Sequence, residues 1–103
     1  MTKIKFKLTK SEVKALVMGC ELGCKNGNDF GITHKAAKHL LTRLAIKILS
    51  RADNLKDKNN SISISFPEAW AISMQCCGII EILGPFEQVV MQTIIDEIHR
   101  KAA

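Results

Sequence analysis

The chain has 103 residues, of which 47% are apolar and 24% are charged, and it carries a net charge of +5. This length and composition predict a single globular domain, residues 1–103, and exclude a disordered tail or a fibrous repeat. The positive charge permits nucleic acid, an acidic protein or anionic lipid as a partner without selecting one of them.

The basic residues are mainly lysine, with twelve Lys against three Arg. Base edges and paired phosphate contacts favour Arg, so this balance points away from sequence-specific recognition. The N-terminal residues lack the continuous apolar segment of a signal peptide, and the apolar run over 69–83 is too short to span a bilayer. With four cysteines and no export signal, we expect a cytoplasmic protein with free thiols and no membrane association.

Two short segments alternate apolar and polar residues, which is the pattern of a strand with one buried face. They are residues 4–8 (IKFKL) and 61–66 (SISISF), and each runs into a Ser/Thr-x-x-Glu capping box. In such a box the hydroxyl and the carboxylate each accept a hydrogen bond from a backbone amide at the start of a helix. The boxes are Thr9 with Glu12 and Ser65 with Glu68. We predict that the two strands pair as a ribbon with the lysines facing water.

Apolar residues repeat at helical spacing in four further segments. The predicted helices run from the first capping box to a C-terminal Gly23, from an N-cap at Thr33 to Asp53, from Pro67 to Leu83, and from Phe86 to Lys101. Residues 23–33 are rich in glycine and asparagine, which predicts a loop that Phe30 and Ile32 attach to the core. Gly78 predicts a close helix approach, a bend or a break in the third helix.

These elements predict an α+β fold that is predominantly helical, with four helices packed on a short two-stranded β-ribbon. A two-stranded ribbon is marginal in water, so the helices must supply most of the burial. The order of strand, capping box, helix and helix occurs in residues 3–56 and again in 62–101, which suggests a βαα-βαα pseudo-repeat. Ile4, Phe6 and Leu8 then correspond to Ile62, Ile64 and Phe66 at a constant offset of 58 residues. Chance alternation is the other explanation.

Basic residues recur every fourth position along the second helix, and no acid lies between Asp29 and Asp53. The residues of this basic series are Lys35, His39, Arg43, Lys47 and Arg51. Like charges at this spacing cost about 0.2–0.5 kcal/mol per pair in an exposed helix. Either apolar burial outweighs this cost and the series is only solvated, or it faces an anionic partner, nucleic-acid phosphate or an acidic protein. In the second case, Lys3, Lys5 and Lys7 could extend it.

The third helix is apolar on almost every side, and the fourth has a broad apolar face. A domain this small hides such surfaces poorly, which predicts self-association, most simply as a homodimer. The candidate interface residues are Trp70, Ile72, Met74, Ile79, Ile80, Met91 and Ile95.

No pattern in the sequence indicates catalysis. The cysteines are Cys20, Cys24, Cys76 and Cys77, and they lack the C-x2-C spacing of a zinc site. Glu12 and Glu68 are explained as capping residues, and the glycines match no phosphate-binding loop. We therefore expect no enzyme, no metal and no cofactor. The sequence predicts a small binding protein of bacterial or mobile-element type. The first hypothesis is a self-associating protein-interaction module, and the alternative is a protein that binds the phosphate backbone of nucleic acid.

Overall fold

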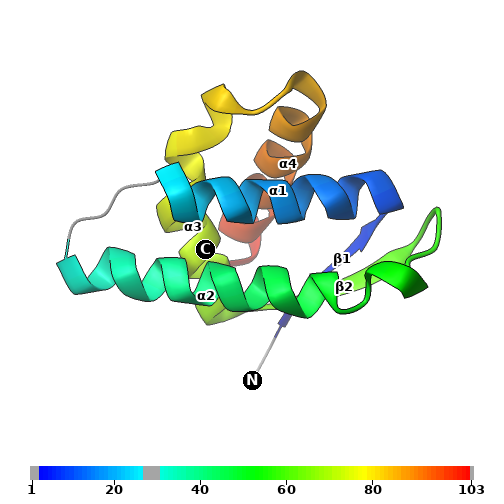
Figure 1. Ribbon diagram of the computed structural model, residues 1–103, viewed down its shortest axis with the longest axis horizontal. Coiled ribbons are helices and arrows are strands. Elements are labelled where there is room, and N and C mark those ends of the chain that lie inside the picture. The colour runs from blue at the N-terminus through cyan, green and yellow to red at the C-terminus, as the bar shows by residue number, and fades with distance from the viewer. Residues whose placement is uncertain (1–2, 27–30, 103) are drawn as a thin grey trace.

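The structure is a computed structural model that describes residues 3–26 and 31–102, with the side chains of 26, 52, 77–79 and 102 left out of the description. Figure 1 shows four α-helices gathered on one two-stranded ribbon. The elements are β1 (Lys3–Leu8), α1 (Lys10–Asn26), α2 (Gly31–Leu49), the 3-10 helix η1 (Ala52–Asn54), β2 (Asn60–Ser65), α3 (Phe66–Cys76), the 3-10 helix η2 (Cys77–Ile82) and α4 (Pro85–Ala102). The predicted α+β, predominantly helical class is confirmed. No helix in this described part of the chain is long and apolar enough to cross a bilayer.

The two strands pair, as the alternating patterns predicted, and the pairing is antiparallel. Ile4 lies opposite Ile64 and Phe6 lies opposite Ile62, and all four side chains are buried. The other face of the ribbon is directed outward and sets three exposed lysines opposite three serines. These pairs are Lys3 with Ser65, Lys5 with Ser63, and Lys7 with Ser61.

Both capping boxes form as predicted. The amide of Thr9 donates to Oε1 of Glu12 (2.8 Å), and the amide of Glu12 donates to Oγ1 of Thr9 (3.2 Å). In the second box the amide of Ser65 donates to Oε1 of Glu68 (2.9 Å), and the amide of Glu68 donates to Oγ of Ser65 (3.3 Å). Each strand therefore passes directly into a helix whose first amides are satisfied.

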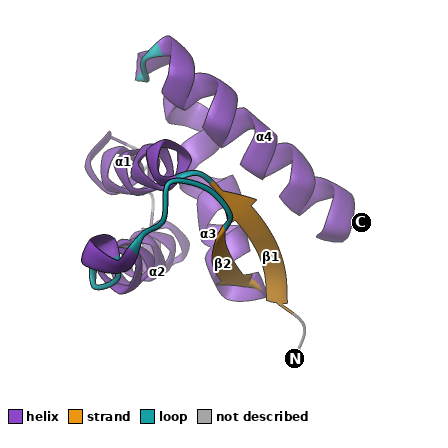
Figure 2. Cartoon of the chain, turned by 90° about the vertical axis from the view of Figure 1, so that its right-hand side faces the viewer, coloured by secondary structure: helices purple, strands orange, loops and turns teal. Residues whose placement is uncertain are grey.

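The helices cover the apolar face of the ribbon and one another. α1 and α2 lie side by side along the molecule (Figure 1), and both pack against α3, while α4 packs against α1. Seen from the side, the ribbon lies between α2 and the C-terminal half of α4 (Figure 2). Leu16, Leu44 and Ile72 are among the fully buried side chains at the centre.

The predicted loop over 23–33 is wrong at both ends. α1 continues through Gly23 to Asn26, and Gly23 lies inside the helix where the side chains of Cys76 from α3 and Leu41 from α2 come close to it. A methyl group on Gly23 would lie 3.2 Å from Sγ of Cys76, so the glycine serves packing and does not end the helix. Ile32 is 85% exposed and attaches nothing to the core, whereas Phe30 lies outside the described residues.

Two predicted helix boundaries are also wrong. α2 begins at Gly31, so Thr33 lies inside the helix and is not its N-cap, and α2 ends at Leu49 before a turn leads into η1. The single helix predicted from Pro67 to Leu83 consists of α3 followed by η2. The change from α to 3-10 geometry falls beside Gly78, one of the outcomes expected there.

A buried asparagine, Asn60, organises the connection before β2. Nδ2 of Asn60 donates to the carbonyl oxygens of Leu8 (3.1 Å) and Lys56 (2.7 Å), and Oδ1 accepts from the amide of Lys56 (2.7 Å). The preceding Asn59 has a positive φ of 62°, a conformation that asparagine tolerates better than most residues. These bonds satisfy the buried amide and fix the start of β2.

The pseudo-repeat remains a prediction. The two halves share the order of their elements, but the third pair of residues at the constant offset, Leu8 and Phe66, does not occupy equivalent places in the structure. Leu8 is buried in β1, whereas Phe66 is the first residue of α3 and is 38% exposed.

We expect Gly19→Ala to destabilise the protein. A methyl group on Gly19 would lie 2.6 Å from Sδ of Met91, a fully buried side chain of α4. The overpacking outweighs the helix propensity gained, for a net loss of about 1–2 kcal/mol in the free energy of unfolding. Urea denaturation measures it, with Lys14→Ala at an exposed position of α1 as the control. Equal or greater stability of Gly19→Ala would contradict the close packing of α1 on α4.

Candidate functional site

The basic series of the second helix does not form one straight row. Four residues turn an α-helix about 40° beyond a full turn, so Lys35 and Lys47 project about 120° apart around the axis. Lys35, His39, Arg43 and Lys47 are all exposed on α2, and Arg51 lies in the turn after its end. The series therefore winds around α2 and reaches the ribbon only at its C-terminal end.

At that end, three cations from separate parts of the chain line one cavity of about 210 Å³. β1 contributes Lys3, α2 contributes Lys47, and the following turn contributes Arg51. The remaining lining residues are Ile48, Ile62 and Ser63, of which the two isoleucines are buried and Ser63 is partly exposed. A concave surface with an apolar wall and several like charges concentrates an electrostatic potential, so we call this set of residues the basic cavity.

Arg51 is held in the basic cavity by the edge of the sheet. Its Nη1 donates to the carbonyl oxygen of Ser61 on β2, at 3.1 Å. A guanidinium carries five N–H donors in a rigid fork, so this one bond restrains the group near β2 while its other N–H groups can still donate to an anion.

Lys47 is held by the capping carboxylate of α3. Nζ of Lys47 lies 3.1 Å from Oε2 and 3.3 Å from Oε1 of Glu68, whose side chain is only 13% exposed. Burial acts to raise the pKa of Glu68, but the amide and hydroxyl of Ser65 and the Lys47 ammonium outweigh it, so the pKa is lowered from its ordinary value. One carboxylate therefore caps α3 and orients a cation, and the group of three cations keeps a net positive charge.

The predicted oligomer interface is divided by the structure. Ile72, Met91 and Ile95 are at most 2% exposed within the single chain, so they belong to its core and were wrongly assigned to an outer surface. Helical periodicity identifies apolar faces but does not tell which elements cover them. Trp70 is 39% exposed, Met74 and Ile80 are partly buried, and the side chain of Ile79 is outside the description.

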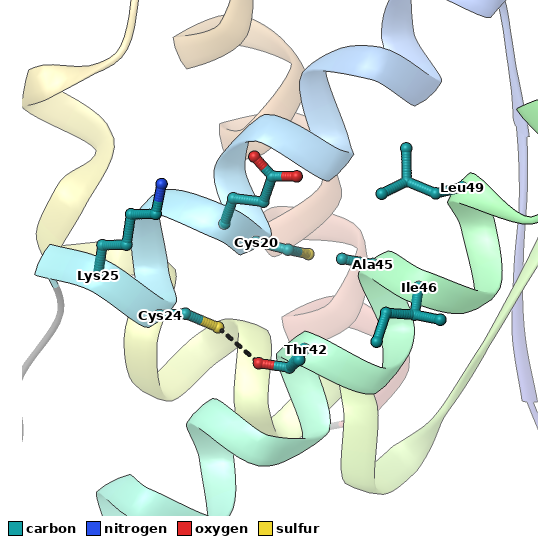
Figure 3. Close-up of a pocket in the computed structure, with 8 residues that line it drawn as sticks. Cys20, Cys24, Lys25, Thr42, Ala45, Ile46 and Leu49 are labelled. Carbon is teal, nitrogen blue, oxygen red and sulfur yellow. Dashed lines mark hydrogen bonds between the residues drawn. The ribbon is translucent and has the colours of Figure 1, made fainter.

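The cysteines are distributed through the α1–α2–α3 packing. Cys20 and Cys76 are buried, and the partly exposed Cys24 donates to the carbonyl oxygen of Lys38 and lies 3.4 Å from Oγ1 of Thr42 (Figure 3). Burial raises the pKa of the Cys20 thiol well above its ordinary value, which keeps it protonated and unreactive. Within the described residues, no three His, Cys, Asp or Glu side chains come together as a metal site requires. The Cys77 side chain is outside that description.

The sequence analysis listed these basic residues but did not predict that three of them line one cavity. It offered Lys3 only as an extension of a helical row, whereas Lys3 lines the same cavity as Lys47 and Arg51. The antiparallel pairing of β1 with β2 brings these three residues together. No local pattern in the sequence predicts the distance between Lys3 on β1 and the end of α2. Comparisons with known proteins found no family, no curated protein and no solved structure that matches this chain.

The lowered pKa of Glu68, which the Ser65 amide and the Lys47 ammonium cause, makes the stability of the protein depend on pH. Because the pKa of Glu68 is lowered from 4.5 on folding, the carboxylate stabilises the native state above that pH, and the contribution is lost as the pH falls through the lowered pKa. Glu68→Gln retains an oxygen that can accept from the Ser65 amide but removes the charge. We therefore expect the variant to be less stable than the wild type at pH 7 and the difference to shrink as the pH falls below 4.5.

Urea denaturation across this pH range measures the difference. Glu12→Gln is the matched control, since it alters the equivalent capping carboxylate of α1, which makes no ion pair within the described residues. A loss of stability for Glu68→Gln that stays constant as the pH falls from 7 to below 4.5 would contradict a role for the charge.

Proposed function

We propose that the protein binds the phosphate backbone of nucleic acid at the basic cavity, without catalysis and without strong sequence specificity. The observation that carries this proposal is the convergence of Lys3, Lys47 and Arg51 on one cavity. Two of these cations are positioned by bonds to their own structural partners, Glu68 and the Ser61 carbonyl. Such preorganisation reduces the entropy that binding must overcome.

The outer face of the ribbon continues the basic cavity. Lys3, Lys5 and Lys7 occupy alternate positions of β1 and are exposed. The Cα atoms of successive lysines are therefore about 6.8 Å apart, and the row spans about 14 Å. Phosphates of one DNA strand advance about 3.4 Å per nucleotide along the duplex axis, so the row covers about four of them. The serines opposite these lysines offer hydroxyl donors to the same backbone.

The composition of this surface favours backbone contacts over base recognition. Lysine is a flexible point charge that pairs with phosphate, and Arg51 is the single arginine lining the basic cavity. No aromatic side chain lines it, so stacking on unpaired bases is poorly provided for and a duplex is the expected ligand. In the same proposal the protein works in a reducing cytoplasm, where Cys20 and Cys24 stay as thiols.

Fluorescence anisotropy of labelled duplex DNA tests this proposal. Affinity should fall log-linearly between about 50 and 200 mM salt, because each contacted phosphate releases counterions. Lys3→Gln and Lys47→Gln should each weaken binding to every duplex sequence and lower the salt slope by about one. Lys101→Gln at the end of α4, across the ribbon from α2 (Figure 2), carries the same charge change and should bind like the wild type.

Two results would count against the basic cavity. Absence of binding at about 50 mM salt would remove the nucleic-acid proposal, because electrostatic affinity is greatest there. Equal weakening by Lys101→Gln and Lys47→Gln would show that net charge, and not the cavity, attracts DNA.

Self-association is a second candidate function, supported by one row of side chains on α3. Phe66, Trp70 and Met74 follow each other at four-residue spacing and so lie along one side of the helix. Phe66 and Trp70 are 38% and 39% exposed, and Met74 is partly buried. Two copies that paired these rows about a two-fold axis would bury both aromatic rings, which is the usual geometry of a homodimer.

Sedimentation velocity measures this association. Protein concentrations up to about 100 µM are used, so that a weak but specific dimer is detected. We expect a dimer for the wild type and a monomer for Trp70→Lys, because the ammonium would be desolvated in the interface. Ile82→Lys, at a 60% exposed apolar residue outside the row, is the matched control and should stay dimeric. A monomeric wild type over the whole range would contradict the self-association proposal.

A further inference from the structure

An apolar groove follows the line where α1 and α2 meet on the outside of the molecule. It consists of two successive cavities of about 240 and 150 Å³ that share Leu49 as a lining residue. In the first, Cys20 and Cys24 of α1 face Ala45 and Ile46 of α2 (Figure 3). The second continues toward the N-terminal end of α1 and is lined by Val13, Val17, Ile48, Leu49 and Leu55, with Lys14 at its edge. We call the two cavities together the α1–α2 groove.

Large aliphatic side chains border this groove while remaining in water. Ile46 is 61% exposed and Leu49 is 50% exposed, whereas Cys20 and Ala45 at the base are buried. Removing such side chains from water is favourable, and the residues beneath them already form an apolar base. The groove therefore has the composition of a site that a second apolar surface can complete.

The charges around the groove favour an acidic occupant. α2 contributes no Asp or Glu between Gly31 and Leu49. The α1 edge carries Lys14 and Lys25, with a single acid, Glu21, between them. The two lysines are separated by eleven positions, so they lie about 16 Å apart along the helix. This spacing places them at opposite ends of the groove.

The structure also restricts the backbone conformation of the occupant. Inside α1 and α2 the backbone amides and carbonyls bond within each helix, so the groove offers no edge to which an added strand could pair. No aromatic side chain lines either cavity, as polyproline recognition requires. Two neighbouring helices do present a row of depressions into which the ridge of a third helix can pack.

We propose that the α1–α2 groove binds an acidic amphipathic helix of a partner protein. Apolar side chains at i, i+3 or i+4, and i+7 of that helix fill the two cavities. Acidic residues toward its ends lie against Lys14 and Lys25. The groove and the basic cavity share one lining residue, the buried Ile48, but they share no charged residue, and Ile46 faces α1 whereas Lys47 contacts Glu68 of α3. Helix binding and nucleic-acid binding can therefore be lost independently.

A display library of helices about 15 residues long tests the proposal, since that length spans the distance between the two lysines with a turn to spare. Leucine is fixed at the apolar positions, and the flanking positions vary among Glu, Lys, Gln and Ser. The library is selected against the full-length protein, and enriched peptides are measured by fluorescence anisotropy. Ile46→Glu places a charge in the groove, and Ile32→Glu makes the same change at an 85% exposed isoleucine of the same helix that borders neither cavity.

We expect glutamate at the flanks of the enriched peptides, affinity reduced at least about tenfold by Ile46→Glu, and no change for Ile32→Glu. The combined change of Lys14→Glu and Lys25→Glu should shift the enriched flanks from glutamate to lysine. Circular dichroism of each variant establishes that the fold is kept. No enrichment on the wild type over Ile46→Glu would overturn the proposal, as would equal enrichment of lysine-flanked peptides. Unchanged peptide binding by Lys47→Gln separates this result from the nucleic-acid proposal.

Discussion

The constraint on which the structure depends is that a ribbon of only two strands must bury one of its faces. Such a ribbon is marginal in water, and here Ile4, Phe6, Ile62 and Ile64 supply an apolar face that the helices cover. A shift of β1 by one residue against β2 would turn Ile4 and Phe6 outward and bury three lysines, which fixes the register strongly. The capping boxes determine where the chain leaves the ribbon, because each strand ends at the residue where a helix begins. The helix that follows then packs over the apolar face of the ribbon.

The candidate site is a consequence of this arrangement. With the register fixed, Lys3, Lys5 and Lys7 are held on the outer face, and β2 lies beside the end of α2. Glu68 then serves two purposes, since the carboxylate that caps α3 also orients Lys47. Charged side chains positioned by the bonds that hold the fold together lose little freedom on binding, which is why we assign the phosphate-binding role to them and not to the rest of the basic series.

Local rules predicted the parts of this fold that depend on neighbouring residues. The alternation of IKFKL and SISISF and the two capping boxes gave the strands, their pairing and the starts of α1 and α3. The failures came where packing between distant elements decides the outcome. Gly23 was interpreted as a helix end, but it allows α3 to approach α1, and Ile72 and Met91 were interpreted as interface but are covered by their own chain. For the same reason, the sequence shows where the basic residues are but not that three of them share a cavity. The distance between β1 and α2 depends on how the chain folds, and neither segment alone predicts it.

Our main proposal is that phosphate backbones bind at the basic cavity. It is tested most directly by recording amide chemical shifts of the isotope-labelled protein while duplex DNA is added at about 50 mM salt, where electrostatic binding is strongest. We expect the perturbed amides to lie in residues 3–7, 47–51 and 61–63, in the segments that form the basic cavity and the outer face of the ribbon. Perturbations confined to the N-terminal half of α2 or to α4, or no perturbation at this salt concentration, would contradict it.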